Sequence, residues 1–150
     1  VIDQLVGALG ADEQINYREQ NLRDEIKRLT GGQGVDVVMD PVGGDYAEPA
    51  LRSMAWRGRY LVVGFTDGQI PRLPLNLVLL KGCAIVGVFW GDFIRREPQA
   101  AQTDLHDLVD LLRQGKIKPL ISGRYSLEQA SQAILELSQR RAQGKLIVLP

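Results

Sequence analysis

The chain has 150 residues, 45% of them hydrophobic, and a formal net charge of zero, as expected for one soluble domain with a real core. The zero net charge gives no electrostatic reason to expect nucleic acid or an anionic membrane as a partner. No apolar run approaches the length of a membrane span. The single Cys83 excludes an internal disulfide framework and fits a reducing cytoplasm. With only one histidine beside it, we expect no metal site built from this chain alone.

The start of the chain predicts two helices and little else. Residues 1–9 have the apolar period of a helix that stops at Gly10. Because no capping residue precedes this helix, we interpret the chain as starting within an element. Residues 14–17 form a short edge strand at most. Asn21 then suits the cap of a second helix, whose apolar face carries Leu22, Ile26 and Leu29.

Val35–Met39 begins the part of the sequence that organises the fold. This run is almost wholly apolar, as expected for a parallel strand with helices on both faces. Asp45, with Glu48 three residues later, predicts a capping box. The helix that follows stops at Gly58, and its apolar face is made of Ala47, Ala50, Leu51, Met54 and Ala55. Tyr60–Val63 is a second buried strand, so a right-handed βαβ unit is predicted.

A third strand, Cys83–Phe89, follows a short helical segment at Leu75–Leu80. Each predicted strand ends in a turn that contains glycine, and these turns are Pro41–Gly44, Gly64–Gly68 and Phe89–Gly91. In open parallel sheets, ligands bind beyond the carboxyl ends of the strands, and glycine lets a ligand lie close to the backbone. The sequence therefore predicts an α/β fold with a binding site at this edge of the sheet.

The remainder of the chain predicts two more helices and two short strands. Pro98–Arg113 is a helix whose inward face carries Leu105, Leu108, Val109 and Leu112. Leu120–Tyr125 is a strand. Ser126 and Gln129 form a capping box for a helix whose inward face carries Leu127, Ala130, Ala133, Ile134 and Leu137. Lys145–Leu149 is the closing strand.

Several segments, taken together, resemble a known superfamily. They are ALGAD with INYR, LTGGQGVDVVMDPVGG, GRYLVVGF, LLKGCAIVGVFWG and QGKLIVLP. In this order they resemble the medium-chain dehydrogenase/reductase superfamily, and within it the zinc-independent NAD(P)H:quinone oxidoreductases, the zeta-crystallin-like group. The resemblance implies a Rossmann-like doubly wound parallel sheet, preceded in the intact parent by a GroES-like catalytic domain.

The glycine-rich fingerprint that opens such a cofactor domain is absent from the sequence. We therefore expect the sheet to be truncated in its amino-terminal half. Residues 1–118 would be the later part of the cofactor domain, and residues 119–150 a tail that returns to the catalytic domain. Within this chain, Val35–Met39 should have an unpaired edge. Leu120–Tyr125 and Lys145–Leu149 should pair with each other or with nothing, apart from the main sheet. The chain alone is expected to be inactive.

The resemblance implies cofactor contacts in the first two turns. Val42 and Gly43 would approach the ribose or the nicotinamide side of a dinucleotide. Gly64, Phe65 and Thr66 resemble the family's second cofactor loop. The structural alternative is that both segments are only tight turns between elements.

Further cofactor contacts are implied elsewhere in the chain. Val88, Phe89 and Trp90 resemble the segment whose backbone meets the nicotinamide carboxamide, although their side chains also suit a core or a dimer contact. Tyr17 resembles a residue that packs near the adenine ribose, and a half-buried structural role is its alternative. Lys145 resembles a basic residue near the cofactor in some relatives.

Other reactive residue types receive no catalytic role. Arg18 suits the 2′-phosphate of NADPH, although an arginine there is often only solvated. His106 is expected on the surface, and Cys83 is expected to pack in its strand. Asp40 has no evident partner in the sequence, so a structural role at the strand end is favoured over a catalytic one.

The resemblance implies an NADPH-dependent reductase of quinones or conjugated carbonyls, with NADH as the possible alternative cofactor and no metal. Two alternatives within the superfamily are an enoyl-thioester reductase and a zinc-dependent alcohol dehydrogenase. A non-catalytic dinucleotide-binding or crystallin-like structural protein is the alternative of another class. Because Cys83–Phe89 is an apolar edge strand without proline or charge, we expect it to pair with its symmetry mate in a homodimer.

Overall fold

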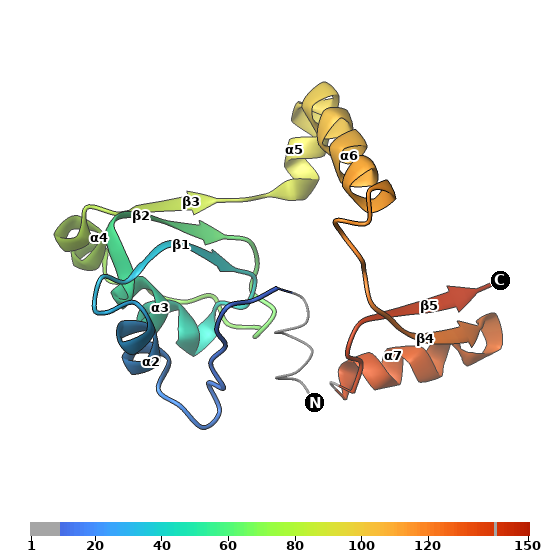
Figure 1. The fold of residues 1–150 in the computed structure, drawn as a ribbon, viewed down its shortest axis with the longest axis horizontal. Helices are drawn as coiled ribbons and strands as arrows, with labels where there is room; N and C mark the ends of the chain where they lie inside the picture. Colours follow the sequence, from blue (N-terminus) through green and yellow to red (C-terminus); the bar gives the residue numbers. More distant parts are fainter. Residues whose placement is uncertain (1–9, 140) are drawn as a thin grey trace. The chain divides into compact units, whose positions relative to one another are not determined.

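In the computed structural model, the chain consists of two compact units. The first unit contains a sheet of three parallel strands (Figure 1). The structure describes residues 10–139 and 141–150, and the division falls between Asp92 and Phe93. The predicted helix over residues 1–9 lies outside the described residues. No helix in the described part of the chain is long and apolar enough to cross a membrane. The domain boundary expected after residue 118 stays a prediction.

The sheet has the order β1-β2-β3, with β1 at Val35–Asp40, β2 at Met54–Val62 and β3 at Ala84–Gly87. Both pairs are parallel. This confirms the α/β class and the adjacent, parallel placement of the first two apolar runs. Among the described residues β1 pairs only with β2, so the expected unpaired edge of β1 is also confirmed. The third strand is shorter than Cys83–Phe89, since β3 contains only the four residues from Ala84 to Gly87.

A bulge interrupts β2 near its start. Val35 lies opposite Met54, whereas Val37 already lies opposite Arg59, so the intervening residues of β2 loop out of the register. The expected helix end at Gly58 is therefore wrong: the helix ends at residue 52, and Gly58 is buried inside the strand. Met54 and Ala55, which fit the helical period, instead form the buried start of β2. Here the packing of the strand outweighs the local helical pattern.

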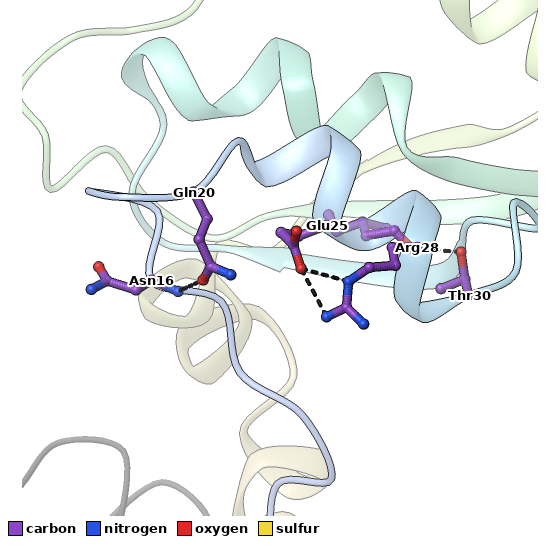
Figure 2. Close-up of polar contacts among 6 residues, drawn as sticks. Asn16, Gln20, Glu25, Arg28 and Thr30 are labelled. Atoms are coloured by element: carbon purple, nitrogen blue, oxygen red, sulfur yellow. Dashed lines mark hydrogen bonds and ion pairs between the residues drawn. The ribbon is translucent and has the colours of Figure 1, made fainter.

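Helix α2 (Leu22–Leu29) begins as predicted, since the Asn21 side chain accepts a hydrogen bond from the backbone of Asp24. From residue 10 to α2 the structure contains no strand. Residues 14–16 have no regular structure and lead into a turn over residues 17–19, where the Asn16 N–H donates to the Gln20 side chain at 2.8 Å. Figure 2 shows this contact and, at the other end of the helix, the Thr30 hydroxyl that donates to the Ile26 carbonyl at 2.7 Å.

The predicted capping box of Asp45 and Glu48 is wrong. Gly43 and Gly44 have φ values of 72° and 58° and lead into a short 3₁₀ helix, η1 (Gly44–Tyr46), before α3 (Ala47–Arg52). Asp45 therefore lies inside η1, one residue before Tyr46 at the cap position of α3, and Glu48 pairs with Arg52 at 2.6 Å. Helix α4 (Leu75–Lys81) ends as expected at Gly82, which has the left-handed conformation that glycine tolerates best.

The core of this unit lies between α3, α4 and one face of the sheet. Tyr60 and Leu51 are its largest fully buried side chains, and the cluster around them also contains Ala47, Met54, Leu77 and Cys83. The expected packing of Cys83 in its strand region is thus confirmed. On the other face of β1, Val37 and Met39 are exposed. Helices on both faces of this strand were expected, and only one face is covered in the described unit.

The second unit contains α6 (Pro98–Arg113), β4 (Ile121–Ser126), η2 (Leu127–Gln129), α7 (Ala130–Ser138) and β5 (Lys145–Leu149). Strands β4 and β5 pair in parallel as a separate sheet, and the Ser126–Gln129 capping box is present, as expected. A further helix, α5 (Trp90–Arg96), was not predicted and spans the division between the units. The inward faces of α6 and α7 were wrong in part, because the exposed residues include Leu105, Leu108, Leu112, Ile134 and Leu137.

Candidate functional site

Two turns meet at the carboxyl ends of β1 and β2, and their backbones are hydrogen-bonded to each other. We call residues 40–44 and 63–69 the strand-end turns. Thr66 N–H donates to the Pro41 carbonyl and Asp67 N–H donates to the Val42 carbonyl, each at 3.1 Å. In the opposite direction, Gly44 N–H donates to the Gln69 carbonyl at 3.1 Å. The two loops that the sequence marked as binding candidates therefore form one fixed surface.

Glycine in the first turn makes room for the second turn. A Cβ added to Gly43 would lie 2.8 Å from Phe65 Cδ1 and 3.2 Å from the Gln69 carbonyl oxygen. At Gly44, an added Cβ would collide with the Asp67 side chain. On the side where a Cβ would stand, Gly43 and Gly44 are thus covered by the second turn, and the cofactor contact expected at Gly43 stays a prediction. At Gly68 this side of the backbone is open, because no atom would lie within 4 Å of a Cβ.

Asp40 holds the first turn in place. Its Oδ1 accepts hydrogen bonds from the backbone N–H groups of Val42 at 2.8 Å and Gly43 at 2.9 Å. Its Oδ2 accepts a hydrogen bond from the Tyr60 hydroxyl at 2.5 Å. Burial and the hydrogen bond to Asp40 both raise the pKa of Tyr60 well above that of a free tyrosine. The tyrosine therefore stays protonated as a donor, and the aspartate links β2 to the turn of β1.

The third predicted segment follows β3 at the same edge of the sheet. Val88 N–H donates to the Val62 carbonyl at 2.9 Å, which extends the pairing of β3 with β2 beyond the strand itself. Phe89 and Trp90 are 76% and 51% exposed. The backbone is also open here, because a Cβ added to Gly87 would have no neighbour within 4 Å.

Tyr17 lies against η1, which follows the first strand-end turn, although the sequence places it far away. Its ring packs edge-to-face on Tyr46 of η1, with the centroids 4.8 Å apart. The next residue, Arg18, is exposed. The structure thus brings Tyr17 to the helix that follows the first turn; its expected contact with a cofactor stays a prediction. Lys145 opens β5 in the second unit and is therefore described apart from these residues, and His106 is exposed on α6 as expected.

This surface fits the nicotinamide half of a dinucleotide. The flat ring of nicotinamide needs apolar contacts, and Phe65, Val88, Phe89 and Trp90 supply exposed apolar side chains after the strands. Its carboxamide needs backbone donors and acceptors, which irregular segments with open glycines can present. The pyrophosphate half has no counterpart in this chain, because the sequence contains no glycine-rich fingerprint. Within the described residues no group of three or more His, Cys, Asp or Glu is placed to hold a metal ion.

The sequence did not predict that Asp40 and Tyr60 hold the first strand-end turn in place. Asp40 was read as having no partner, yet it has three donors. Its aspartate–proline sequence at the end of an apolar run was a usable signal, since Asp accepts hydrogen bonds from backbone groups two and three residues later. Tyr60 was read only as the first residue of a strand. Nothing local marked its hydroxyl as the partner of a residue twenty positions earlier.

A protein-family model described as zinc-binding dehydrogenase matches residues 9–148. A quinone oxidoreductase-like protein 2 from Bos taurus is 37% identical over 145 residues, which cover 97% of this chain and 42% of that protein. A quinone oxidoreductase-like protein 2 homolog from Nematostella vectensis is 35% identical over 145 residues, which cover 96% of this chain and 40% of that protein.

Among solved structures, the Escherichia coli quinone oxidoreductase complexed with NADPH matches with a TM-score of 0.86 and 29% sequence identity. The match covers 98% of this chain and 46% of that one. The chain thus spans less than half the length of the relatives that it matches.

Proposed function

Because the chain belongs to the zinc-binding dehydrogenase family, in the quinone oxidoreductase group of the medium-chain dehydrogenase/reductase superfamily, we propose that the whole protein is an oxidoreductase that uses NADPH to reduce a quinone or a conjugated carbonyl. The observation that carries this proposal is the pair of hydrogen-bonded strand-end turns, with exposed apolar side chains beside them. The name of the Escherichia coli relative, which includes NADPH, supports the choice of cofactor.

When bound, NADPH supplies the hydride, and the protein supplies position and electrostatics. Val42 and Gly43 would hold the ribose side, because Asp40 fixes the turn that carries them. Phe65 and Thr66 would form the second wall of the cofactor site.

The backbone of Val88, Phe89 and Trp90 would orient the carboxamide and so select the face of the ring. Tyr17 would border the adenine ribose from its position on Tyr46. Arg18, beside it, is the residue that we propose for the 2′-phosphate. Lys145 in β5 stays a proposed cofactor residue on the strength of the resemblance alone. We assign no acid–base residue in this chain.

We propose that the reaction does not require zinc, in spite of the name of the family model. The support is the quinone oxidoreductase group of the named relatives and the resemblance of this sequence to the zinc-independent branch. Metal analysis of the whole protein, with activity measured before and after chelation, tests this point.

The deciding experiment measures NADPH oxidation by the whole protein with a panel of quinones, enones and enoyl thioesters. We expect quinones or simple enones to be reduced, with NADPH preferred to NADH. Turnover of enoyl thioesters alone would replace the proposed substrate class. Alcohol oxidation that is lost on chelation would support a zinc-dependent dehydrogenase instead. Failure of the whole protein to bind any dinucleotide would favour a structural role.

We also propose that the whole protein is a homodimer through the edge around Cys83–Phe89. Ile85 and Val86 on this edge are 36% and 40% exposed, and among the described residues β3 pairs on one side only. Val88 donates to Val62 of β2, and the N–H groups of neighbouring strand residues alternate in direction, so the Ile85 N–H points to the unpaired edge. Ile85→Pro should shift the protein toward monomer in size-exclusion chromatography with light scattering, because proline removes a donor from that edge. Ile85→Thr keeps the donor and should remain dimeric. A dimer that survives Ile85→Pro would place the interface elsewhere.

A further inference from the structure

A cavity of about 380 Å³ lies at the other end of the first unit, where β1 and β2 begin. Gly34, just before β1, and Ser53, just before β2, form part of its wall, so the length of the strands separates it from the strand-end turns. Its volume is within the range of small-molecule sites. Nothing in the cofactor arrangement proposed above uses this cavity.

Four cations line the cavity, and no aspartate or glutamate lines it. The cations are Arg23, Lys27, Arg52 and Lys81. The whole chain has a formal net charge of zero, so the positive charge of this wall is a local concentration. A cavity lined by charge of one sign attracts small ions of the opposite sign.

The four cations differ in whether another group of the protein already pairs with their charge. Arg52 is paired with Glu48 at 2.6 Å, and Lys81 Nζ donates to the Met54 carbonyl at 3.0 Å. The carbonyl does not neutralise Lys81, which keeps its charge and two further N–H donors. Arg23 and Lys27 are four residues apart on α2 and therefore share a face, where like charges repel. Neither Arg23 nor Lys27 forms an ion pair within the described residues. An anion in the cavity would therefore meet three cations without a carboxylate partner, namely Arg23, Lys27 and Lys81.

An aromatic ring stands beside these cations. Trp56 lines the cavity and is 70% exposed. It is carried by the bulge of β2, where Arg57 has a φ of 64° and is the one non-glycine residue with positive φ in the described part of the chain. The ring lies against Gly82, because a Cβ added there would be 3.0 Å from two of its carbon atoms. The bulge and the glycine thus present a fixed, exposed indole ring at the cavity, and strained bulges of this kind often aim a side chain at a functional site.

We propose that this cavity binds a small molecule in which a phosphate dianion is joined to an aromatic ring. Arginine and lysine donors suit phosphate oxygens. A dianion balances the surplus charge better than a single carboxylate. The indole ring of Trp56 offers a stacking surface for the aromatic part. The site is independent of the proposed oxidoreductase activity, so either can fail without the other.

The test is isothermal titration calorimetry of the whole protein with naphthyl phosphate, inorganic phosphate and naphthol. We expect naphthyl phosphate to bind more tightly than either half alone. Lys27→Ala should weaken it about tenfold, as expected for loss of one charged hydrogen bond. Trp56→Ala should remove the advantage of naphthyl phosphate over inorganic phosphate and leave inorganic phosphate binding unchanged.

Arg28→Ala is the matched control, because it removes a cation from the same helix without touching the cavity. Arg28 reaches back to Glu25 at 2.8 Å (Figure 2) and does not line the cavity. Its affinity for naphthyl phosphate should equal that of the wild-type chain. Thermal melting of each variant checks the fold, and Lys27→Gln repeats the test with a polar side chain of similar length. Absence of saturable binding, or equal losses in Lys27→Ala and Arg28→Ala, would overturn the proposal.

Discussion

The Tyr60→Phe substitution removes one buried hydrogen bond and leaves the aromatic packing of the core in place. Tyr60 is 1% exposed, and its hydroxyl donates to Asp40 at 2.5 Å. Phenylalanine fills the same ring volume, whereas the carboxylate of Asp40 loses one of its donors. A hydrogen bond to a charged group contributes ~1.5–3 kcal/mol. We therefore expect the free energy of unfolding of the first unit to fall by about 2 kcal/mol.

Urea denaturation followed by tryptophan fluorescence measures this loss, because Trp56 and Trp90 both lie in the first unit. With a slope of about 2 kcal/mol per molar urea, the midpoint should fall by about 1 M and the slope should not change. Tyr17→Phe is the matched control, since Tyr17 is 49% exposed and its hydroxyl has no hydrogen bond within the described residues. Equal midpoints for the two variants would refute the assignment of stability to the Asp40 contact.

The same contact predicts how stability depends on pH at the alkaline end. The pKa of Tyr60 is raised in the folded chain by burial and by Asp40, from 10.0 in a free tyrosine. The folded state therefore holds this proton more tightly than the unfolded state does. The resulting stabilisation is fully present below pH 10 and is lost as the pH rises from there toward the folded pKa. In Tyr60→Phe this part of the slope of unfolding free energy with pH should be absent.

One further prediction concerns the strand-end turns, and another concerns Arg18. Gly43→Ala should destabilise the first unit by about 2 kcal/mol, because φ is 72° and the new Cβ would lie 2.8 Å from Phe65. Gly68→Ala should cost only about 1 kcal/mol, since its strain is that of the backbone alone and no atom lies within 4 Å; equal losses in the same urea assay would contradict the packing argument. In the whole protein, Arg18→Ala should raise the dissociation constant of NADPH more than that of NADH, because guanidinium suits the 2′-phosphate; equal effects by calorimetry would remove Arg18 from the cofactor site.

The sheet was predictable because its signals are local. Val35–Met39 and Tyr60–Val63 are short apolar runs bounded by turn residues, and parallel pairing follows from the helix between them. The cap at Asn21 and the capping box at Ser126 also depend on neighbouring residues only, and both are present. The end of α3 was not predictable, because the apolar Met54 and Ala55 fit a helix face as well as a buried strand, and only the pairing with β1 decides between them.

The sequence predicts where a ligand would bind, but it does not predict the contacts that build this surface. Three glycine-containing turns after parallel strands indicate where a ligand would bind. The contacts that shape the site join residues far apart in the sequence: Asp40 with Tyr60, Gly43 with Phe65, and Tyr17 with Tyr46. None of these pairs has a spacing that a helix or a turn would impose. The apolar face of α6 was misjudged for a related reason, since periodicity identifies an apolar face without showing what covers it.

The contact between Asp40 and Tyr60 also connects the stability of the fold with the proposed cofactor site. The turn that would hold the cofactor is anchored through Asp40 to a residue of the core, so its geometry depends on the packing of β1 against β2. If this anchor positions the turn, Tyr60→Phe should raise the dissociation constant of NADPH in the whole protein about threefold to tenfold, which corresponds to ~0.7–1.4 kcal/mol. Tyr125→Phe is the control, because its hydroxyl donates to Glu136 in the second unit. Lower stability of Tyr60→Phe with unchanged NADPH affinity would mean that the backbone bonds from Thr66 and Asp67 hold the turn without the aspartate.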